Sequence, residues 1–168
     1  MTASEGDPPA AAPTAVVITV STRASAGVYE DRSGPIIADV LAELGFEVWG
    51  PRVVPDGVAV GAALRTAIQD GAAVVITSGG TGLNPNDHTP EQTAAVIERS
   101  LPHLAAEISR YGVQHGVPTA MLSRGLAGTA GRTLVVNLPG SSGGARDGMA
   151  VLRPVLVHAI DQLRGGDH

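Results

Sequence analysis

Apolar residues recur along the chain in two distinct patterns. Three short runs, residues 15–20 (AVVITV), 72–77 (AAVVIT) and 133–138 (TLVVNL), are nearly continuous and rich in β-branched side chains. Such runs, each followed by a loop containing Ser, Gly or Pro, are typical of strands that are buried on both faces of a parallel sheet. Residues 46–54 (FEVWGPRVV) form a fourth, less regular candidate strand.

Between these runs the apolar positions follow a helical period. The pattern predicts helices over residues 37–44 and 60–68, which Gly45 and Gly71 end. Thr89 begins a Thr-x-x-Gln capping box with Pro at the first helical position, which predicts a helix start there. Further helices are expected over residues 101–111, 142–149 and 153–163, the last with Pro154 in its first turn. Residues 117–132 are consistent with a short strand and a loop.

Strands that alternate with helices predict an α/β fold with a mainly parallel sheet. The 168 residues suit one domain, and the sequence contains no internal repeat. Residues 1–14 are small, Pro-rich and acidic, so we expect a disordered N-terminal tail before a single domain over residues 15–165.

Composition narrows the possible functions. Aromatic residues make up only 2% of the chain, so the core must be built from Ala, Val, Leu and Ile. The absence of cysteine excludes disulfides, thiolate zinc sites and a cysteine nucleophile. A net charge of -5 without basic runs argues against nucleic-acid or anionic-membrane binding. The start of the chain lacks a basic signal-peptide region and its first apolar run is too short to span a membrane, so we expect a cytoplasmic protein.

Four loops follow the predicted strands, over residues 21–27, 54–57, 78–87 and 139–144. In open α/β sheets, ligands bind beyond the carboxyl ends of the strands, so these loops should meet at a common site. The third loop reads SGGTGLNPND, and its glycines allow backbone N–H groups to approach a phosphate closely. A Walker loop is excluded because the chain has no lysine, and the spacing does not fit a G-x-G-x-x-G dinucleotide fingerprint.

Simpler explanations of the same residues exist. The glycines could form only a tight turn, Asp56 could be an ordinary helix N-cap, and Asp87 could favour the next helix N-terminus. Three glycine-rich loops with two acidic residues at one sheet edge instead favour a phosphate site. Two carboxylates there would suit Mg²⁺, which takes one or two carboxylates plus substrate phosphates.

Other catalytic patterns are weak. The G-x-S-x-G motif of serine hydrolases is absent. His103, His115 and His158 occur singly, without the spacing of a metal site, and His88 is interpreted as a solvated loop residue. Arg124 could serve either a subunit interface or the site.

Five motifs occur together and in order: VSTRASAGVYEDRSGP, VPDG, TSGGTGLNPNDHTPE, PTAMLSR and LVVNLPG. On these motifs, over about residues 16–163, the chain resembles the molybdopterin adenylyltransferases of the Mog/MoaB type and the G domains of gephyrin-like proteins. The resemblance implies a three-layer α/β fold that is commonly trimeric. It also implies transfer of an adenylyl group from Mg-ATP to the terminal phosphate of molybdopterin, with release of pyrophosphate.

The same resemblance implies roles for individual residues. Asp87 matches the family's essential aspartate and Asp56 its second acidic position, so both would be catalytic and would hold the metal. The residues implied to bind substrate or nucleotide are Ser21, Arg23, Gly79, Gly80, Thr81, Gly82, Ser123, Asn137 and Gly140.

The chain departs from the family pattern in two places. Asn86 stands where the family usually has Arg, and the loop after NLPG reads SSGG, where the family usually has a Pro. Asn86 favours an alternative in which the protein binds molybdopterin and hands it on with little catalysis. A third hypothesis is a structural trimer whose loops are only turns. In either functional case, a separate protein would insert molybdate.

Overall fold

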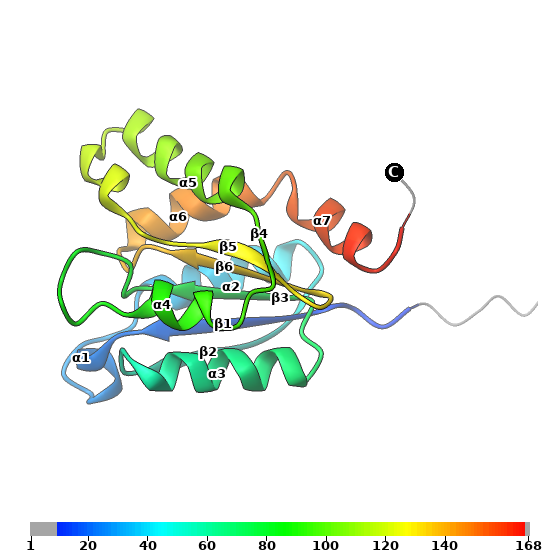
Figure 1. Ribbon diagram of the computed structural model, residues 1–168, viewed down its shortest axis with the longest axis horizontal. Coiled ribbons are helices and arrows are strands. Elements are labelled where there is room, and N and C mark those ends of the chain that lie inside the picture. Colours follow the sequence, from blue (N-terminus) through cyan, green and yellow to red (C-terminus); the bar gives the residue numbers. More distant parts are fainter. Residues whose placement is uncertain (1–9, 167–168) are drawn as a thin grey trace, which may run out of the picture.

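The apolar runs form a six-stranded sheet in the computed structural model of the protein, which describes residues 10–166 (Figure 1). The spatial order of the strands is β2-β1-β3-β6-β5-β4. The first four strands in this order are parallel, β5 is antiparallel to β6, and β4 is antiparallel to β5. Their bounds are β1 Thr14–Val20, β2 Glu47–Val54, β3 Val74–Ser78, β4 Arg99–Ser100, β5 Ala127–Ala130 and β6 Thr133–Leu138.

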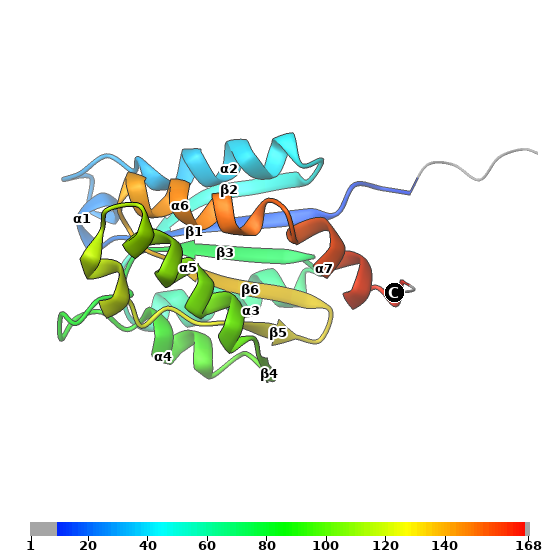
Figure 2. The same cartoon turned by 90° about the horizontal axis from the view of Figure 1, so that it is seen from above.

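Helices cover both faces of this sheet. Seven α-helices and one 3-10 helix lie within the described residues: α1 Thr22–Ser25, α2 Ser33–Glu43, α3 Val58–Gln69, α4 Thr89–Ala94, α5 Pro102–Gln114, η1 Pro118–Leu122, α6 Ser142–Leu152 and α7 Leu156–Leu163. Figure 1 shows α3 and α4 on one side of the sheet and α5, α6 and α7 on the other. Seen from above, α2, α6 and α5 lie side by side over the sheet (Figure 2).

Side-chain alternation along the strands separates two cores. Odd-numbered residues of β1 and even-numbered residues of β3 and β6 pack against α2, α5, α6 and α7. The opposite residues, including Ile18, Val75 and Val135, pack against α3. Since both faces of the central strands are covered, their sequences are mainly apolar on both faces, as expected for buried parallel strands. The α/β three-layer prediction is confirmed.

Several predicted boundaries need correction. The strand predicted over residues 15–20 begins one residue earlier, at Thr14, and residues 1–9 of the expected tail lie outside the described part of the chain. The helix predicted over residues 153–163 starts only at Leu156, because Pro154 interrupts the chain after α6. The two-residue strand β4 was not predicted, since Arg99 and Ser100 are polar and exposed.

Close packing of α6 on β6 leads to a stability prediction. A Cβ at Gly148 would lie 2.5 Å from Cδ2 of the fully buried Leu138, whereas a Cβ at Gly143 in the same helix would meet nothing within 4 Å. Overpacking costs about 1–3 kcal/mol, against a gain of up to ~1 kcal/mol when Ala replaces Gly in a helix. We therefore expect Gly148→Ala to unfold at lower urea concentration than the wild type, and Gly143→Ala at equal or higher concentration. Equal midpoints for the two variants would contradict this packing.

Candidate functional site

Three loops meet at the carboxyl edge of the sheet with their backbones in contact. The Gly79 N–H donates to Leu138 O at 3.0 Å, and a Cβ at Gly140 would lie 3.1 Å from Gly79 Cα. A side chain at position 79 would also collide with the carbonyl oxygen of Val20, and Gly79 has a φ of 105°. Only glycine satisfies both requirements, so the loop after β3 is held between the ends of β1 and β6.

Asp56 links two of the loops through its carboxylate. Its Oδ1 accepts hydrogen bonds from Gly57 N–H at 2.7 Å and from His88 N–H at 2.9 Å. The N-cap of α3 is Gly57, with no side-chain cap, so Asp56 is not an ordinary N-cap of that helix. It reaches across to the start of α4 instead, and thereby joins the β2–α3 loop to the β3–α4 loop.

The predicted capping box at Thr89 is wrong. The N-cap of α4 is His88, Thr89 is already helical, and the helix has no side-chain cap of its own. The physical reason is that the cap comes from another element: Asp56 accepts the His88 N–H, and Gly80 O accepts the Thr89 N–H at 3.2 Å.

The Thr89 hydroxyl is therefore left without a protein partner. Its Oγ1 is the one buried side-chain N or O atom without a hydrogen bond among residues 10–166, and the residue has no exposed surface. Any Cβ at Gly80 would collide with both Thr89 Oγ1 and Asp56 Oδ2. A glycine at position 80 thus keeps a small space that is lined by a hydroxyl and a carboxylate oxygen.

Asp87 closes its own loop on the other side of the glycines. Its Oδ2 accepts from Gly82 N–H at 3.0 Å, and its N–H donates to Asn84 O at 2.8 Å. Since Asp56 bonds His88, the next residue along the chain, the two acidic residues are brought together at the glycine loop. Each carboxylate has one oxygen bonded to the backbone, which leaves Asp56 Oδ2 and Asp87 Oδ1 for a ligand.

Arg124, which is distant in the sequence, donates several hydrogen bonds to this loop. Its backbone N–H donates to Thr81 O at 2.8 Å, its Nε to Gly82 O at 2.9 Å and its Nη2 to Asp87 O at 2.9 Å. Its Nη1 forms an ion pair with Glu91 Oε1 in α4. The sequence alone had left Arg124 open between an interface and the site, and the structure places it against the Asp87 loop.

The Arg124–Glu91 pair has a pH dependence. The hydrogen bond from Arg124 lowers the pKa of the Glu91 carboxyl below its ordinary value of 4.5. Because the pKa is lowered in the folded state, the pair stabilises the protein above the ordinary pKa, and this contribution is lost as pH falls through the lowered pKa. Exposure of Glu91 to solvent screens the interaction, so its share in global stability is small.

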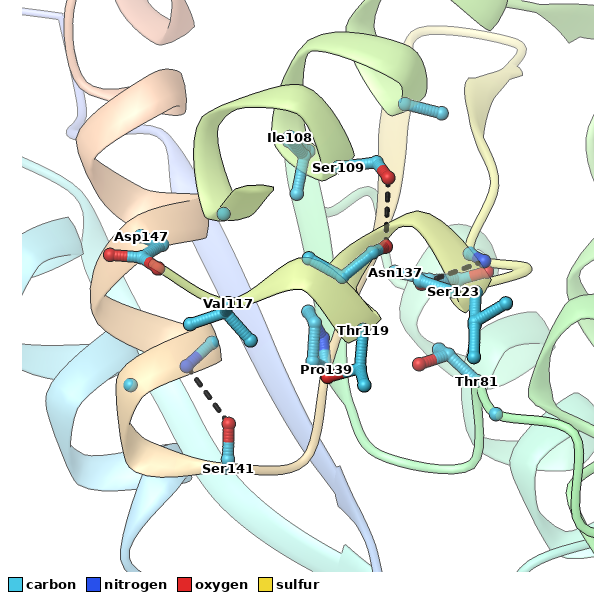
Figure 3. A pocket seen from close by; sticks show the side chains of 18 of the residues that line it. Thr81, Ile108, Ser109, Val117, Thr119, Ser123, Asn137, Pro139, Ser141 and Asp147 are labelled. Atoms are coloured by element: carbon cyan, nitrogen blue, oxygen red, sulfur yellow. Dashed lines mark hydrogen bonds between the residues drawn. The ribbon is translucent and has the colours of Figure 1, made fainter. Parts of the chain in front are cut away.

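A cavity of about 420 Å³ opens on one side of the glycine loop. Apolar side chains of α5 and η1 line it, together with Thr81, Ser123 and Asn137 (Figure 3). Asp147, from α6, is the one charged residue among its lining residues and lies across the cavity from Thr81 and Ser123 in Figure 3. This volume and mainly apolar lining are typical of small-molecule sites.

Asn137 contributes to this cavity mainly by holding its wall. It is only 4% exposed, and its side-chain amide donates to Thr77 Oγ1 and to Thr93 Oγ1, both at 2.9 Å. Its Oδ1 accepts from Leu126 N–H at 3.0 Å. Both amide donors are thus engaged within the protein, so the side chain ties β6 to β3 and α4.

A second cavity, of about 370 Å³, lies on the other side of the glycine loop. Its lining includes Ser21, Gly79, Gly80, Gly140 and, as its one arginine, Arg32. Ser21 is the N-cap of α1 and accepts from Ala24 N–H at 3.1 Å, while Arg23 is exposed on that short helix. Ser141, the N-cap of α6, lines both cavities.

Two backbone amides of the glycine loop remain open to a ligand. Gly79 and Gly82 donate to Leu138 O and to Asp87 Oδ2, whereas the N–H groups of Gly80 and Thr81 have no acceptor among residues 10–166. Among residues 10–166, no group of three or more His, Asp or Glu side chains is placed so that it could hold a metal ion. A cation here would have the Asp56 and Asp87 carboxylates and would need further oxygens from a ligand.

The structure therefore divides the sequence-predicted residues into two sets. Asp56 and Asp87 flank the glycine loop, while Ser123 and Asn137 line the larger cavity beside it. Asp147 was not predicted as a site residue. It lies in the middle of α6, and the helical pattern of the sequence cannot show that this position borders a cavity whose other walls come from distant segments.

A search of the helices within residues 10–166 finds none with the length and apolar character of a membrane span.

Comparisons with known proteins agree on one family. Residues 16–158 match the family described as "Probable molybdopterin binding domain". The chain is 35% identical over 153 residues to the molybdopterin adenylyltransferase of Helicobacter pylori, covering 89% of this chain and 86% of that protein. The solved Mog protein of Mycobacterium ulcerans superposes with a TM-score of 0.86 at 52% identity, over 90% of this chain and 99% of that one.

Longer relatives also match. The molybdenum cofactor biosynthesis bifunctional protein of Chlorobaculum tepidum is 38% identical over 157 residues, which cover 93% of this chain and 50% of that protein. The chain thus spans about half the length of these bifunctional relatives.

The buried contacts of Asn137 predict a cost in stability. Asn137→Ala would leave Leu126 N–H and the hydroxyls of Thr77 and Thr93 without their partner, and should lower the free energy of unfolding by about 2–4 kcal/mol. Ser123→Ala, at the cavity surface, should change it by less than about 1 kcal/mol. Urea denaturation measures both, and equal losses would show that Asn137 is not a structural tie.

Proposed function

Because the chain belongs to the family described as "Probable molybdopterin binding domain", we propose that it acts in molybdenum cofactor biosynthesis as a molybdopterin adenylyltransferase. The reaction would transfer the adenylyl group of Mg-ATP to the terminal phosphate of molybdopterin and release pyrophosphate. The observation that carries this proposal is the pair of cavities on either side of one glycine loop, with two carboxylates beside it.

The geometry suits a reaction between two phosphorylated molecules. Each cavity can take one heterocyclic substrate, and the open amides of Gly80 and Thr81 lie where the two cavities meet. An oxygen of the molybdopterin phosphate would attack the α-phosphorus of ATP, and the bond from that phosphorus to the bridging oxygen of pyrophosphate would break. The nucleophile is already anionic and the leaving group is good, so the protein mainly has to position and neutralise charge.

Asp56 and Asp87 fit a magnesium ion. Each has one carboxylate oxygen that is held by backbone N–H groups, which fixes its orientation, and one that is free for a ligand. The unpartnered Thr89 hydroxyl next to Asp56 adds a third oxygen in the same space. When bound, Mg²⁺ would supply charge neutralisation on the phosphates. The role of the chain's own residues is to hold the carboxylates still and keep position 80 free of a side chain.

The larger cavity is the proposed pterin site. Ser123 and Asn137 lie there, and the resemblance assigns the polar residues at these positions to the substrate. A pterin ring carries an N3–H beside a 2-amino group, a paired donor edge that a carboxylate can accept bidentately. Asp147 supplies the one carboxylate in the lining, so we place this edge at Asp147 and the phosphate toward Thr81. The nucleotide would then occupy the second cavity, whose lining includes Arg32 next to Glu30 and Asp31.

A carrier function is the second candidate, and Asn86 favours it. Asn86 stands where the family usually has Arg, and its N–H donates to Asn84 Oδ1 at 2.9 Å within the exposed loop. Arg124 cannot replace the missing charge without giving up its bonds to Gly82 O, Asp87 O and Glu91. A carrier would bind molybdopterin in the larger cavity and release it with little adenylylation.

The resemblance to the family also supports a proposal for the assembly and location of the protein. We propose a cytoplasmic homotrimer that passes its product to a separate molybdate-insertion protein. Exposed apolar side chains on the described chain, such as Trp49 at 43% and Met121 at 63% exposure, offer surface for such contacts.

Measuring pyrophosphate release distinguishes the adenylyltransferase from the carrier. Pyrophosphate release should require Mg-ATP and molybdopterin together, and Asp87→Asn or Asp56→Asn should lower kcat by about 10²-fold or more, because charge neutralisation at the phosphates is lost. Asp39→Asn, on the exposed face of α2, is the matched control and should stay within about 2-fold of the wild type.

The possible outcomes separate the hypotheses. Molybdopterin binding without pyrophosphate release by the wild type would support the carrier. If the wild type neither binds molybdopterin nor releases pyrophosphate, both candidates are ruled out.

Ring recognition tests the location of the pterin. Fluorescence titration should show that Asp147→Asn weakens binding of pterin about 10-fold, since a charge-assisted bidentate contact is lost. Lumazine, which carries an oxygen in place of the 2-amino group, should not be weakened by the substitution, because an amide at position 147 can accept from its N3–H and donate to that oxygen. Equal weakening of both rings, or none of either, would exclude Asp147 as the recognition group.

A further inference from the structure

We infer that Arg124 is a positioning residue that holds the Asp87 carboxylate in place by bonding both ends of the loop that carries it. This inference rests on the proposed role of Asp87. The loop leaves β3, runs through the glycines, and returns to α4 at the carboxyl edge of the sheet (Figure 1). Gly82 and Asp87 are its two ends, and Arg124 donates to the carbonyl oxygen of each at 2.9 Å.

The loop has few other constraints between these ends. Residues 83–86 are exposed, and the hydrogen bonds they make within residues 10–166 are local: Asn86 N–H donates to Asn84 Oδ1 and Asp87 N–H to Asn84 O. Gly82 N–H bonds the Asp87 carboxylate itself, so the carboxylate can keep its orientation only while the two ends stay together. Arg124 is the side chain from outside the loop that connects them.

The contacts require a guanidinium rather than any cation. Nε, Nη1 and Nη2 each donate to a different acceptor, which are Gly82 O, Glu91 Oε1 and Asp87 O. A planar group with donors in fixed directions can satisfy all three, whereas a lysine ammonium on a flexible stem cannot reproduce this geometry. Glu91, in the first turn of α4, fixes the guanidinium from the helix side.

Arg124 therefore acts through Asp87 and not on the substrate. It is absent from the residues that line either cavity, and its donors point to the loop and to α4. The family-typical Arg that Asn86 replaces would be a phosphate ligand, so the two arginines would have different tasks. In this chain, precise placement of Asp87 matters more, because the loop has one positive charge fewer.

The test combines hydrogen exchange with kinetics. In Arg124→Ala, amide exchange of a peptide covering residues 82–88 should rise about 10-fold or more, since the loop opens locally. Peptides from β3 and α3 should be unchanged. With Mg-ATP and molybdopterin, kcat should fall about 10–100-fold while KM for ATP changes less than about 3-fold, because misplacement affects the reacting geometry more than binding.

Three further variants make the result specific. Arg124→Lys keeps the charge and should behave like Arg124→Ala in both readouts, because the planar guanidinium with its fixed donor directions is lost. Glu91→Gln keeps an oxygen acceptor and should stay close to the wild type. Arg153→Ala removes an arginine from a comparable surface ion pair with Glu43, away from the site, and should change neither readout.

Unchanged loop exchange in Arg124→Ala, or full rescue by Arg124→Lys, would overturn the inference. If the wild type shows no adenylyl transfer, the proposed function fails, but the exchange measurement still decides whether Arg124 holds the loop. If the wild type turns over and Arg124→Ala turns over equally, the inference alone fails.

Discussion

At the carboxyl edge of the sheet, three loops come so close that their backbones touch, and the rest of the site depends on this contact. Gly79 fills the space between the end of β1 and the end of β6, where no side chain fits. The strands are buried on both faces and cannot shift without disrupting both cores, so the positions of the loops follow from the packing of the sheet. The two cavities lie on either side because the glycine loop separates them.

Because the loops lie so close together, the Asp56 carboxylate also caps the start of α4. The N-terminus of a helix needs acceptors for its free N–H groups, and α4 receives one from Asp56 instead of from its own Thr89. The helix start and the carboxylate are therefore fixed by the same bond. In consequence, Thr89 keeps a buried hydroxyl without a protein partner, which is unusual in a folded protein and leaves an oxygen that an ion, a water molecule or a ligand can bond.

Periodicity was enough to predict the sheet and most helices, because both depend on local alternation of apolar residues. Residues 133–138 were predicted as a strand and form β6 with the same bounds. The capping box failed because a contact 32 residues away in sequence replaced the local one. Arg124 and Asp147 were unassigned for the same reason, since their partners or cavity belong to distant segments. That Asp56, Asp87 and the glycine loop lie together could be predicted, because the loops after parallel strands meet at one edge of the sheet.

Charge decides how the proposed chemistry can work in this chain. Molybdopterin and ATP are both polyanions, the protein has a net charge of -5, and the two residues beside the glycine loop are acidic. Arg124 is neutralised by Glu91 and bonded to loop carbonyls, and position 86 is Asn. Asp56 and Asp87 would therefore repel the phosphates unless a divalent cation lies between them. Two like charges 4 Å apart in a partly screened site repel each other by on the order of 4 kcal/mol. The two open amides of Gly80 and Thr81 supply only partial charges. The same carboxylates that would exclude free phosphate would thus make the proposed site selective for nucleotide that arrives with its metal.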